Sequence, residues 1–299
     1  MKRFLAICLF ALTLFLFSCE NTGVLSVGDD TDFEESIFVY ETDGGIEGES
    51  TFDDLSQFLT PAPDDDGAHQ KLVAHAGGAV YGFRLTNSLE ALDNAYENGF
   101  RLIELDFERT SDGKYVLLHD WEPMAGRMLF EKRVFTLDEY LSADSFMGLT
   151  LMDLDMLLSW LSEHKDAYII TDAKCGNRPF LADLRQMSGE LFHRFIPQAY
   201  SYEEYSMAKE LGYGRIVLTL YQMGTGNEDE LFSFAEREKP FAITVPMTFL
   251  SEKMISGLAG RGVYTYAHSV NDLSFYENWR EYGLYGIYTD YFYPAKFPY

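Results

Sequence analysis

Residues 103–120 read IELDFERTSDGKYVLLHD, and they combine a strand pattern with an unusual pair of charges. It begins with an apolar run in which the acidic residues Glu104 and Asp106 lie two positions apart. A Ser-Asp-Gly-Lys sequence typical of a hairpin turn follows, and a second apolar run then ends in His119-Asp120. Because residues i and i+2 of a strand project to the same face, the two carboxylates point the same way. The stretch predicts a buried strand with an acidic face and a short hairpin strand after it.

Short apolar runs alternate with amphipathic helical stretches from residue 71 onward. Eight such β–α units predict an α/β fold, a (β/α)₈ TIM barrel, with the hairpin as a small insertion after strand two. An open doubly wound sheet is the alternative, but the glycine pattern of a dinucleotide-binding loop does not follow the first strand. The eight runs occupy residues 71–77, 101–108, 167–174, 194–200, 215–221, 241–247, 263–270 and 285–291.

The N-terminus has the pattern of an exported lipoprotein. A positively charged start precedes an apolar stretch at residues 4–17, which is short for a bilayer span and suits a signal peptide. Residues 16–19 read LFSC and resemble a bacterial lipobox, so we expect residues 1–18 to be a lipoprotein signal peptide and Cys19 to carry lipid. An ordinary signal peptide is the alternative. The expected location is the bacterial cell envelope, periplasmic or at the outer surface, with a lipid anchor in the membrane.

Composition divides the rest of the chain in two. Residues 19–70 contain 15 acidic residues and no Lys or Arg, which predicts an acidic, partly disordered tether before a domain at residues 71–299. Cys175 is left without a partner once Cys8 departs with the signal peptide and Cys19 carries lipid, so no intrachain disulfide is expected. The formal net charge of −25 argues against nucleic acid as a partner, because phosphate backbones require a basic surface.

Polar residues gather where the predicted strands end, and in a barrel of this class the functional site lies at that edge. Paired carboxylates raise one another's pKa unless a cation lies between them, and an all-oxygen ligand set suits Ca²⁺ or Mg²⁺. Two histidines near such a metal are candidates for general acid and base, while a lysine there pairs with the carboxylates or neutralises a phosphate oxygen. The alternative is that one carboxylate of the pair faces the helix layer and has a structural role. The expected metal ligands are Glu104, Asp106 and Asp172, and the expected catalytic residues are His75, His119 and Lys174.

Taken together, these motifs resemble the glycerophosphodiester phosphodiesterase family of the PLC-like phosphodiesterase superfamily, whose members are (β/α)₈ barrels. The resemblance runs from about residue 71 to the C-terminus, and the Glu-x-Asp, Asp-Gly and His-Asp motifs at this spacing are its most specific part. The matching residues are His75-Ala76-Gly77-Gly78, Thr86-Asn87-Ser88, Glu104-Leu105-Asp106, Thr110-Ser111-Asp112-Gly113, His119-Asp120, Asp172-Ala173-Lys174 and Thr289-Asp290.

Three positions depart from the family pattern. Ala76 stands where the family has Arg, which removes a phosphate contact, and Thr86 stands where it has Glu, which removes a carboxylate near the metal. Asp172 replaces a Glu, as in the related sphingomyelinase D branch. The two histidines, the three carboxylates and Lys174 remain, so these departures affect the identity of the substrate more than the catalytic chemistry.

The resemblance implies a metal-dependent phosphodiester hydrolase that cleaves glycerophosphodiesters or related lipid headgroup phosphodiesters. His75 and His119 would act as acid and base, and a cyclic phosphate would form on the way. One alternative is a phospholipase D-like or phosphoinositide-cleaving lyase that releases the cyclic phosphate. The other, from a different class, is a non-catalytic surface protein that binds its ligand on the same barrel, which the changes at Ala76 and Thr86 motivate.

Overall fold

The computed structural model describes residues 70–224 and 226–294. The predicted signal peptide, the predicted lipidation site at Cys19 and nearly all of the predicted tether lie outside the described residues. Within the described part of the chain, no helix is both long and apolar enough to cross a bilayer.

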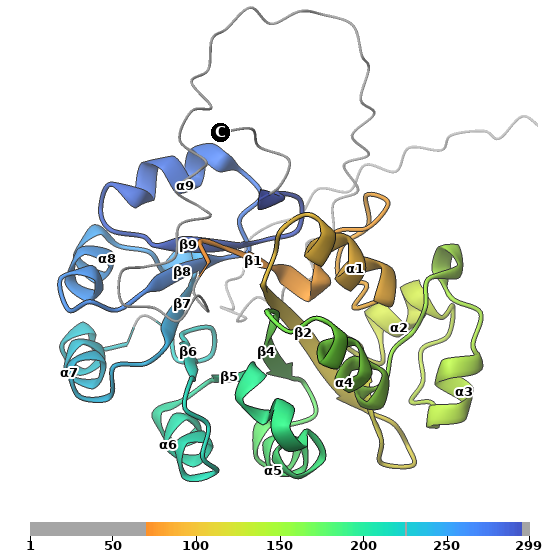
Figure 1. The fold of residues 1–299 in the computed structure, drawn as a ribbon. Helices are drawn as coiled ribbons and strands as arrows, with labels where there is room; N and C mark the ends of the chain where they lie inside the picture. The colour runs from red at the N-terminus through yellow and green to blue at the C-terminus, as the bar shows by residue number, and fades with distance from the viewer. Residues whose placement is uncertain (1–69, 225, 295–299) are drawn as a thin grey trace, which may run out of the picture. The chain divides into compact units, whose positions relative to one another are not determined.

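Eight parallel strands of this region form a closed barrel with one further strand at its side (Figure 1). The barrel closes because β1 pairs in parallel with β9 on one side and with β2 on the other. The extra strand, β3 (Tyr115–Leu117), is antiparallel to β2. Both the predicted barrel and the predicted hairpin are therefore confirmed. The barrel strands, in order of pairing, are β1 (Leu72–Ala74), β2 (Leu102–Arg109), β4 (Tyr168–Ala173), β5 (Phe195–Ala199), β6 (Val217–Thr219), β7 (Ala242–Pro246), β8 (Thr265–His268) and β9 (Gly286–Thr289).

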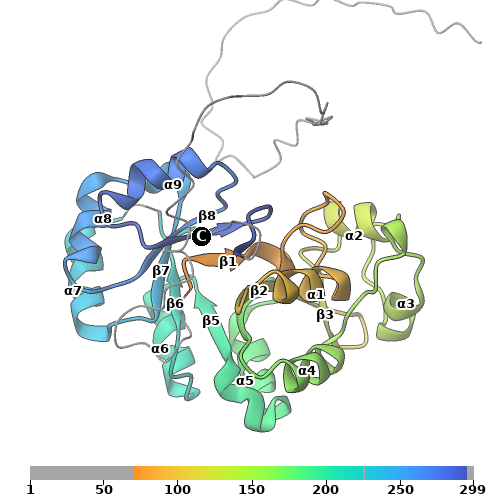
Figure 2. The same cartoon turned by 45° about the horizontal axis from the view of Figure 1, so that its top comes forward.

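Helices follow the strands and cover the outside of the barrel (Figures 1 and 2). Several begin at side-chain caps that the sequence supplies: Ser88, Asp153 and Ser201 each accept a hydrogen bond from the backbone N–H three residues on. The helices are α1 (Leu89–Glu97), α2 (Pro123–Met128), α3 (Leu137–Ser142), α4 (Leu154–Glu163), α5 (Asn177–Met187), α6 (Tyr202–Glu210), α7 (Glu228–Glu238), α8 (Glu252–Ala259) and α9 (Leu273–Arg280).

The insertion after β2 is larger than the predicted hairpin. The chain runs from β3 through α2, α3 and a 3₁₀ turn at Phe146–Gly148 before it reaches α4. Figures 1 and 2 both place α2 and α3 at the side of the barrel. This lobe has an apolar cluster of its own, which explains why it folds beside the barrel. The buried members of that cluster are Val80, Ala91, Val116, Leu118, Met124, Ala125, Met128, Leu129, Phe135, Tyr140, Leu149 and Leu151.

Inside the barrel, each of the eight strands contributes one buried residue to a single apolar layer. Because side chains alternate along a strand, the residues two and four positions further on point to the same interior, at the carboxyl ends of the strands. On β2, that places Glu104 and Asp106 above Leu102. The site therefore sits on an apolar floor. The layer consists of Val73, Leu102, Ile170, Ile196, Val217, Ala242, Tyr266 and Tyr288.

Outside the barrel, Phe180 anchors α5 to β2 and β3. Its fully buried ring lies 4.6 Å from the ring of Phe107 and 5.1 Å from that of Tyr115, measured between centroids. We expect Phe180→Ala to lower the free energy of unfolding by about 3–5 kcal/mol, because the cavity cannot close around a lost ring. Denaturant unfolding measures this, with Phe130→Ala as the control, since the Phe130 ring is largely exposed. Equal losses in both variants would contradict the packing argument.

Candidate active site

Three carboxylates meet at the carboxyl ends of β2 and β4. Parallel pairing places Asp106 directly beside Asp172, and Glu104 lies two residues earlier on the same face of β2. Each of the three offers a carboxylate oxygen within 4.8 Å of the other two. Glu104 and Asp106 are buried and Asp172 is half-buried. The predicted ligand set is thus brought together, and neither β2 carboxylate faces the helix layer.

Glu104 is the most deeply confined of these acids. Its Oε2 accepts a hydrogen bond of 2.8 Å from the backbone N–H of Ala76. Its buried Oε1 has no hydrogen-bond partner among residues 70–224 and 226–294. Burial and the negative charge of Asp106 raise the pKa of Glu104 to about 8, although the charge of His75 lowers it. A buried carboxylate oxygen that lacks a donor and faces two other acids is what a cation site presents.

The ionised carboxylate of Asp106 is better stabilised by its neighbours than that of Glu104. The Asn87 amide donates to its Oδ2 at 2.8 Å, while the Asn87 oxygen accepts from the Asp106 backbone N–H at 3.0 Å. Lys174 Nζ lies 3.3 Å from its Oδ1. Burial raises the pKa of Asp106, but the charges of Lys174 and His119 and the bond from Asn87 outweigh burial and leave it lowered. The two β2 carboxylates therefore differ in protonation through their surroundings.

Asp172 is positioned by a lysine and a tyrosine. Lys174 Nζ donates to Asp172 Oδ2 at 3.0 Å, and the Tyr200 hydroxyl donates to Asp172 Oδ1. Burial would lower the pKa of Lys174, but the charges of Asp106, Asp172 and Glu104 raise it, so the amine stays protonated. Tyr200 directly follows β5, at the same edge of the barrel, and was not predicted as a site residue.

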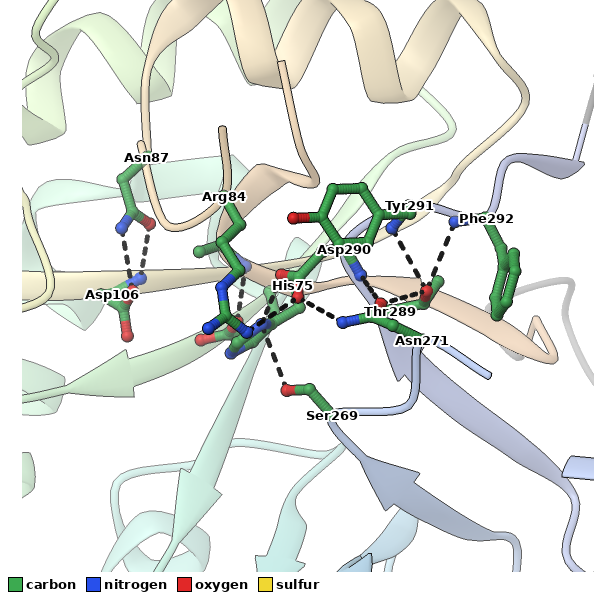
Figure 3. Close-up of polar contacts among 12 residues, drawn as sticks. His75, Arg84, Asn87, Asp106, Ser269, Asn271, Thr289, Asp290, Tyr291 and Phe292 are labelled. Carbon is green, nitrogen blue, oxygen red and sulfur yellow. Dashed lines mark hydrogen bonds and ion pairs between the residues drawn. The ribbon is translucent and has the colours of Figure 1, made fainter. Parts of the chain in front are cut away.

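The predicted His75 lies directly after β1 and is bound by residues from the other end of the chain (Figure 3). Its Nδ1 is 2.9 Å from Asp290 Oδ1, just after β9, and 3.2 Å from Ser269 Oγ. Asn271 in turn donates to Asp290 Oδ2 at 2.7 Å. Burial would lower the pKa of His75, but Asp290, Glu104 and Asp106 outweigh burial and raise the pKa to about 9. With Nδ1 committed to Asp290, Nε2 is the atom that can exchange a proton with a substrate.

The second predicted histidine, His119, lies beyond β3 on the more open side of the site. Its side chain is 36% exposed, and its Nδ1 is 2.8 Å from Asp120 Oδ2. Asp120 Oδ1 also accepts from the backbone N–H groups of Glu122 and Met124, which fixes the carboxylate at the start of α2. Each histidine thus has a carboxylate behind one ring nitrogen, as an oriented acid–base group requires.

Two of the departures from the family pattern have clear structural roles. Ala76 is fully buried in a left-handed conformation with φ of 48°, and its N–H holds Glu104. Thr86 is buried, and its hydroxyl is 3.2 Å from that of Ser88, the cap of α1. At both positions the residue present therefore has a contact of its own beside the site.

The fold and the site together define a (β/α)₈ barrel with an acidic, histidine-flanked centre at the carboxyl ends of its strands. A family model, the glycerophosphoryl diester phosphodiesterase family, matches residues 75–179, which span every predicted catalytic and metal-binding residue. Over that part of its length, the chain is similar to the glycerophosphodiester phosphodiesterase family, a family of phosphoric diester hydrolases.

Individual relatives are distant. The Bacillus subtilis protein YhdW, named as a candidate glycerophosphodiester phosphodiesterase, is 25% identical over 240 residues, which cover 74% of this chain and 94% of YhdW. The glycerophosphodiester phosphodiesterase structure from Thermotoga maritima has a TM-score of 0.61 at 22% identity, covering 77% of this chain and 97% of that one. A phosphodiesterase from Oleispira antarctica, in complex with the product sn-glycerol-3-phosphate, has a TM-score of 0.60 at 18% identity, covering 76% and 94%. These structural likenesses establish the barrel fold.

The contact from Tyr200 supports a testable role in orienting Asp172. We expect Tyr200→Phe to weaken binding of a divalent cation by about 10- to 100-fold, because hydrogen bonds behind a metal ligand fix its orientation. Calorimetric titration with Ca²⁺ and Mg²⁺ measures the change. Tyr202→Phe is the matched control, since Tyr202 lies two residues on at the start of α6 and packs against Phe234. Unchanged affinity in Tyr200→Phe would rule out the orienting role.

Proposed function

We propose that this protein is a metal-dependent hydrolase of glycerophosphodiesters or related lipid headgroup phosphodiesters. The observation that carries the proposal is the group of three carboxylates with a histidine–carboxylate pair on either side. The match to the family model supports the reaction class, and the product bound in the Oleispira relative supports a small phosphodiester as substrate.

The three carboxylates fit a hard divalent cation, which we propose to be Ca²⁺ or Mg²⁺ held by Glu104, Asp106 and Asp172. When bound, such a cation would polarise a phosphoryl oxygen and favour ionisation of an attacking hydroxyl. Among the ligand oxygens, the buried Oε1 of Glu104 would gain most from coordination, because it has no hydrogen-bond partner among the described residues. Lys174 would hold Asp106 and Asp172 in place and stabilise negative charge on the equatorial oxygens.

His75 and His119 would exchange protons with the substrate. Asp290 holds His75 so that Nε2 meets the substrate, and its raised pKa suits a proton donor to the leaving oxygen. His119, paired with Asp120 and more exposed, would accept the proton of the attacking hydroxyl. Attack by a hydroxyl of the substrate itself would form a cyclic phosphate, which water then opens with the two roles reversed.

The remaining expectations from the sequence belong to the same proposal. A lipid anchor at Cys19 would hold the enzyme at the bacterial envelope membrane, where headgroup phosphodiesters are released. The acidic segment before residue 71 would act as the tether.

Product analysis by ³¹P NMR tests the proposal. The purified full-length chain is incubated with glycerophosphodiesters and lysophospholipids, with Ca²⁺, with Mg²⁺ and with a chelator. The expected result is a phosphomonoester signal that the chelator abolishes. A cyclic phosphate that persists would place the protein among the lyases instead. No turnover on any substrate, with the cation still bound, would contradict the proposal and favour a binding protein.

A further inference from the structure

The candidate site gathers several carboxylates around the position proposed for an anionic substrate. Four of its carboxylates are buried or half-buried within one rim, and a phosphodiester brings a further negative charge. Lys174 is already engaged by two of these acids, at 3.0 and 3.3 Å. A second cation near the phosphate position would therefore have a large effect on substrate binding. The four carboxylates belong to Glu104, Asp106, Asp172 and Asp290.

Arg84 brings such a cation to the rim. It lies in the loop between β1 and α1, and its Nη1 is 3.8 Å from Asp290 Oδ2, a separation of an ion pair rather than a hydrogen bond. The Asp290 side chain is fully buried, whereas the Arg84 side chain is 38% exposed. Figure 3 shows Arg84 reaching from its loop to the His75–Asp290 pair.

The strand order puts the two cations on either side of the site. Strands β9, β1, β2 and β4 are consecutive neighbours, and they carry Asp290, His75, the Glu104–Asp106 pair and Asp172 in that order. Lys174 contacts the acids at the β4 end, and Arg84 contacts the acid at the β9 end. A phosphoryl group over the central carboxylates would lie between the two.

The loop that carries Arg84 is well ordered by its own contacts. Val80 and Phe83 exchange two backbone hydrogen bonds of 2.9 Å, and the Ala79 N–H donates to the backbone oxygen of Asp290 at 2.7 Å. The Phe83 ring packs edge-on against Phe146 at 4.5 Å. Because the backbone that carries Arg84 is held in this way, anion binding would order only its side chain, which favours affinity.

The loop also supplies a positive charge that alanine at position 76 does not. The Ala76 side chain is fully buried and its backbone serves Glu104, so this position presents no cation to the site. Arg84, eight residues later in the same β1–α1 connection, presents one from the loop above.

We propose that Arg84 binds the phosphoryl oxygens of the substrate, opposite Lys174, and so takes part in substrate recognition. The inference rests on the proposed phosphodiesterase function and adds a residue to it. A guanidinium is suited to this role because its planar N–H donors match two phosphate oxygens at once.

The test compares Arg84→Gln and Arg84→Lys with a matched control, Arg133→Gln. Arg133 is an exposed arginine paired with Glu131 and Glu139 in the side lobe, so its replacement removes the same charge elsewhere. Calorimetry with sn-glycerol-3-phosphate in the presence of Ca²⁺ should show affinity reduced roughly 10- to 100-fold in Arg84→Gln. Arg84→Lys should retain part of the affinity, because lysine keeps the positive charge but lacks the planar set of N–H donors. Affinity for Ca²⁺ alone and the melting temperature should match the control.

Three outcomes would overturn the proposal. One is Arg84→Gln binding the phosphomonoester as tightly as the unmodified protein. A second is unchanged affinity with a shifted pH profile of kcat, which would mean that Arg84 acts only through Asp290 and His75. The third is no binding of the phosphomonoester by the unmodified protein. Arg84-dependent binding without turnover of any phosphodiester would instead support the anion contact and contradict the hydrolase, so the two proposals can fail separately.

Discussion

His119→Ala is expected to lower kcat on glycerophosphodiesters by roughly 10²- to 10⁴-fold, the range that general acid–base groups supply. His119 is a half-exposed side chain paired with Asp120, so its loss removes a proton-transfer group with little effect on packing. Binding of Ca²⁺ should persist, because the three carboxylates are unchanged. Steady-state kinetics and a calcium titration of the same preparation separate the two effects.

Two further variants sharpen this test. His193→Ala removes an exposed histidine from the 3₁₀ turn at Gly189–Arg194 and should leave kcat unchanged. His75→Ala should be about as damaging as His119→Ala, and the double variant little worse than either, because the two proton transfers belong to one chemical step. Full turnover by His119→Ala on every phosphodiester tested would exclude the proposed role.

Much of the barrel was predictable because its strands are short and strongly patterned. Residues 102–107 have apolar side chains at position 102, in the floor, and at positions 103, 105 and 107, whereas Glu104 and Asp106 fall together on the face of Leu102. Alternation of side chains alone then places Glu104 and Asp106 inside the barrel. The same periodicity carries Asp172 and Lys174 on β4 to the same end, which the structure bears out.

The side lobe was missed because its local signals are weak. Helices α2 and α3 contain six residues each, too short for a helical period to be clear. Some of their contacts join residues that lie far apart in sequence. Tyr140, for example, donates to the backbone oxygen of Leu117, 23 positions earlier.

The partners of the site residues were missed for a related reason. Asp290 meets His75 across 215 positions because closure of the barrel pairs β9 with β1, and Tyr200 meets Asp172 across 28 because β5 pairs with β4. A signal existed for Asp290, which is part of the Thr-Asp motif at the end of the last strand. None marked Arg84, because an arginine in a loop is ordinary until its neighbours are known.

Glu104→Gln is expected to abolish tight binding of the divalent cation and to lower kcat by roughly 10³-fold, since a metal supplies several kcal/mol of transition-state stabilisation. Glutamine keeps an oxygen to accept from the Ala76 N–H, so the local fold should survive. Ca²⁺ should raise the melting temperature of the unmodified protein and leave that of the variant unchanged, because a ligand stabilises only the state that binds it. Glu190→Gln, at an exposed position, is the control.

In chelator, the same substitution should stabilise the protein at neutral and higher pH. Burial and the charge of Asp106 raise the pKa of Glu104 to about 8 from an ordinary value of 4.5. Between these two values the folded chain holds a proton that the unfolded chain has released, so stability falls as pH rises from about 4.5 to about 8. Glutamine does not ionise and removes this contribution. Melting temperatures measured from pH 5 to pH 9 should therefore show Glu104→Gln increasingly more stable than the unmodified protein as pH rises. Parallel curves for the two proteins would contradict this. They would show that Glu104 titrates normally and that its ionised carboxylate does not destabilise the fold in the absence of a cation.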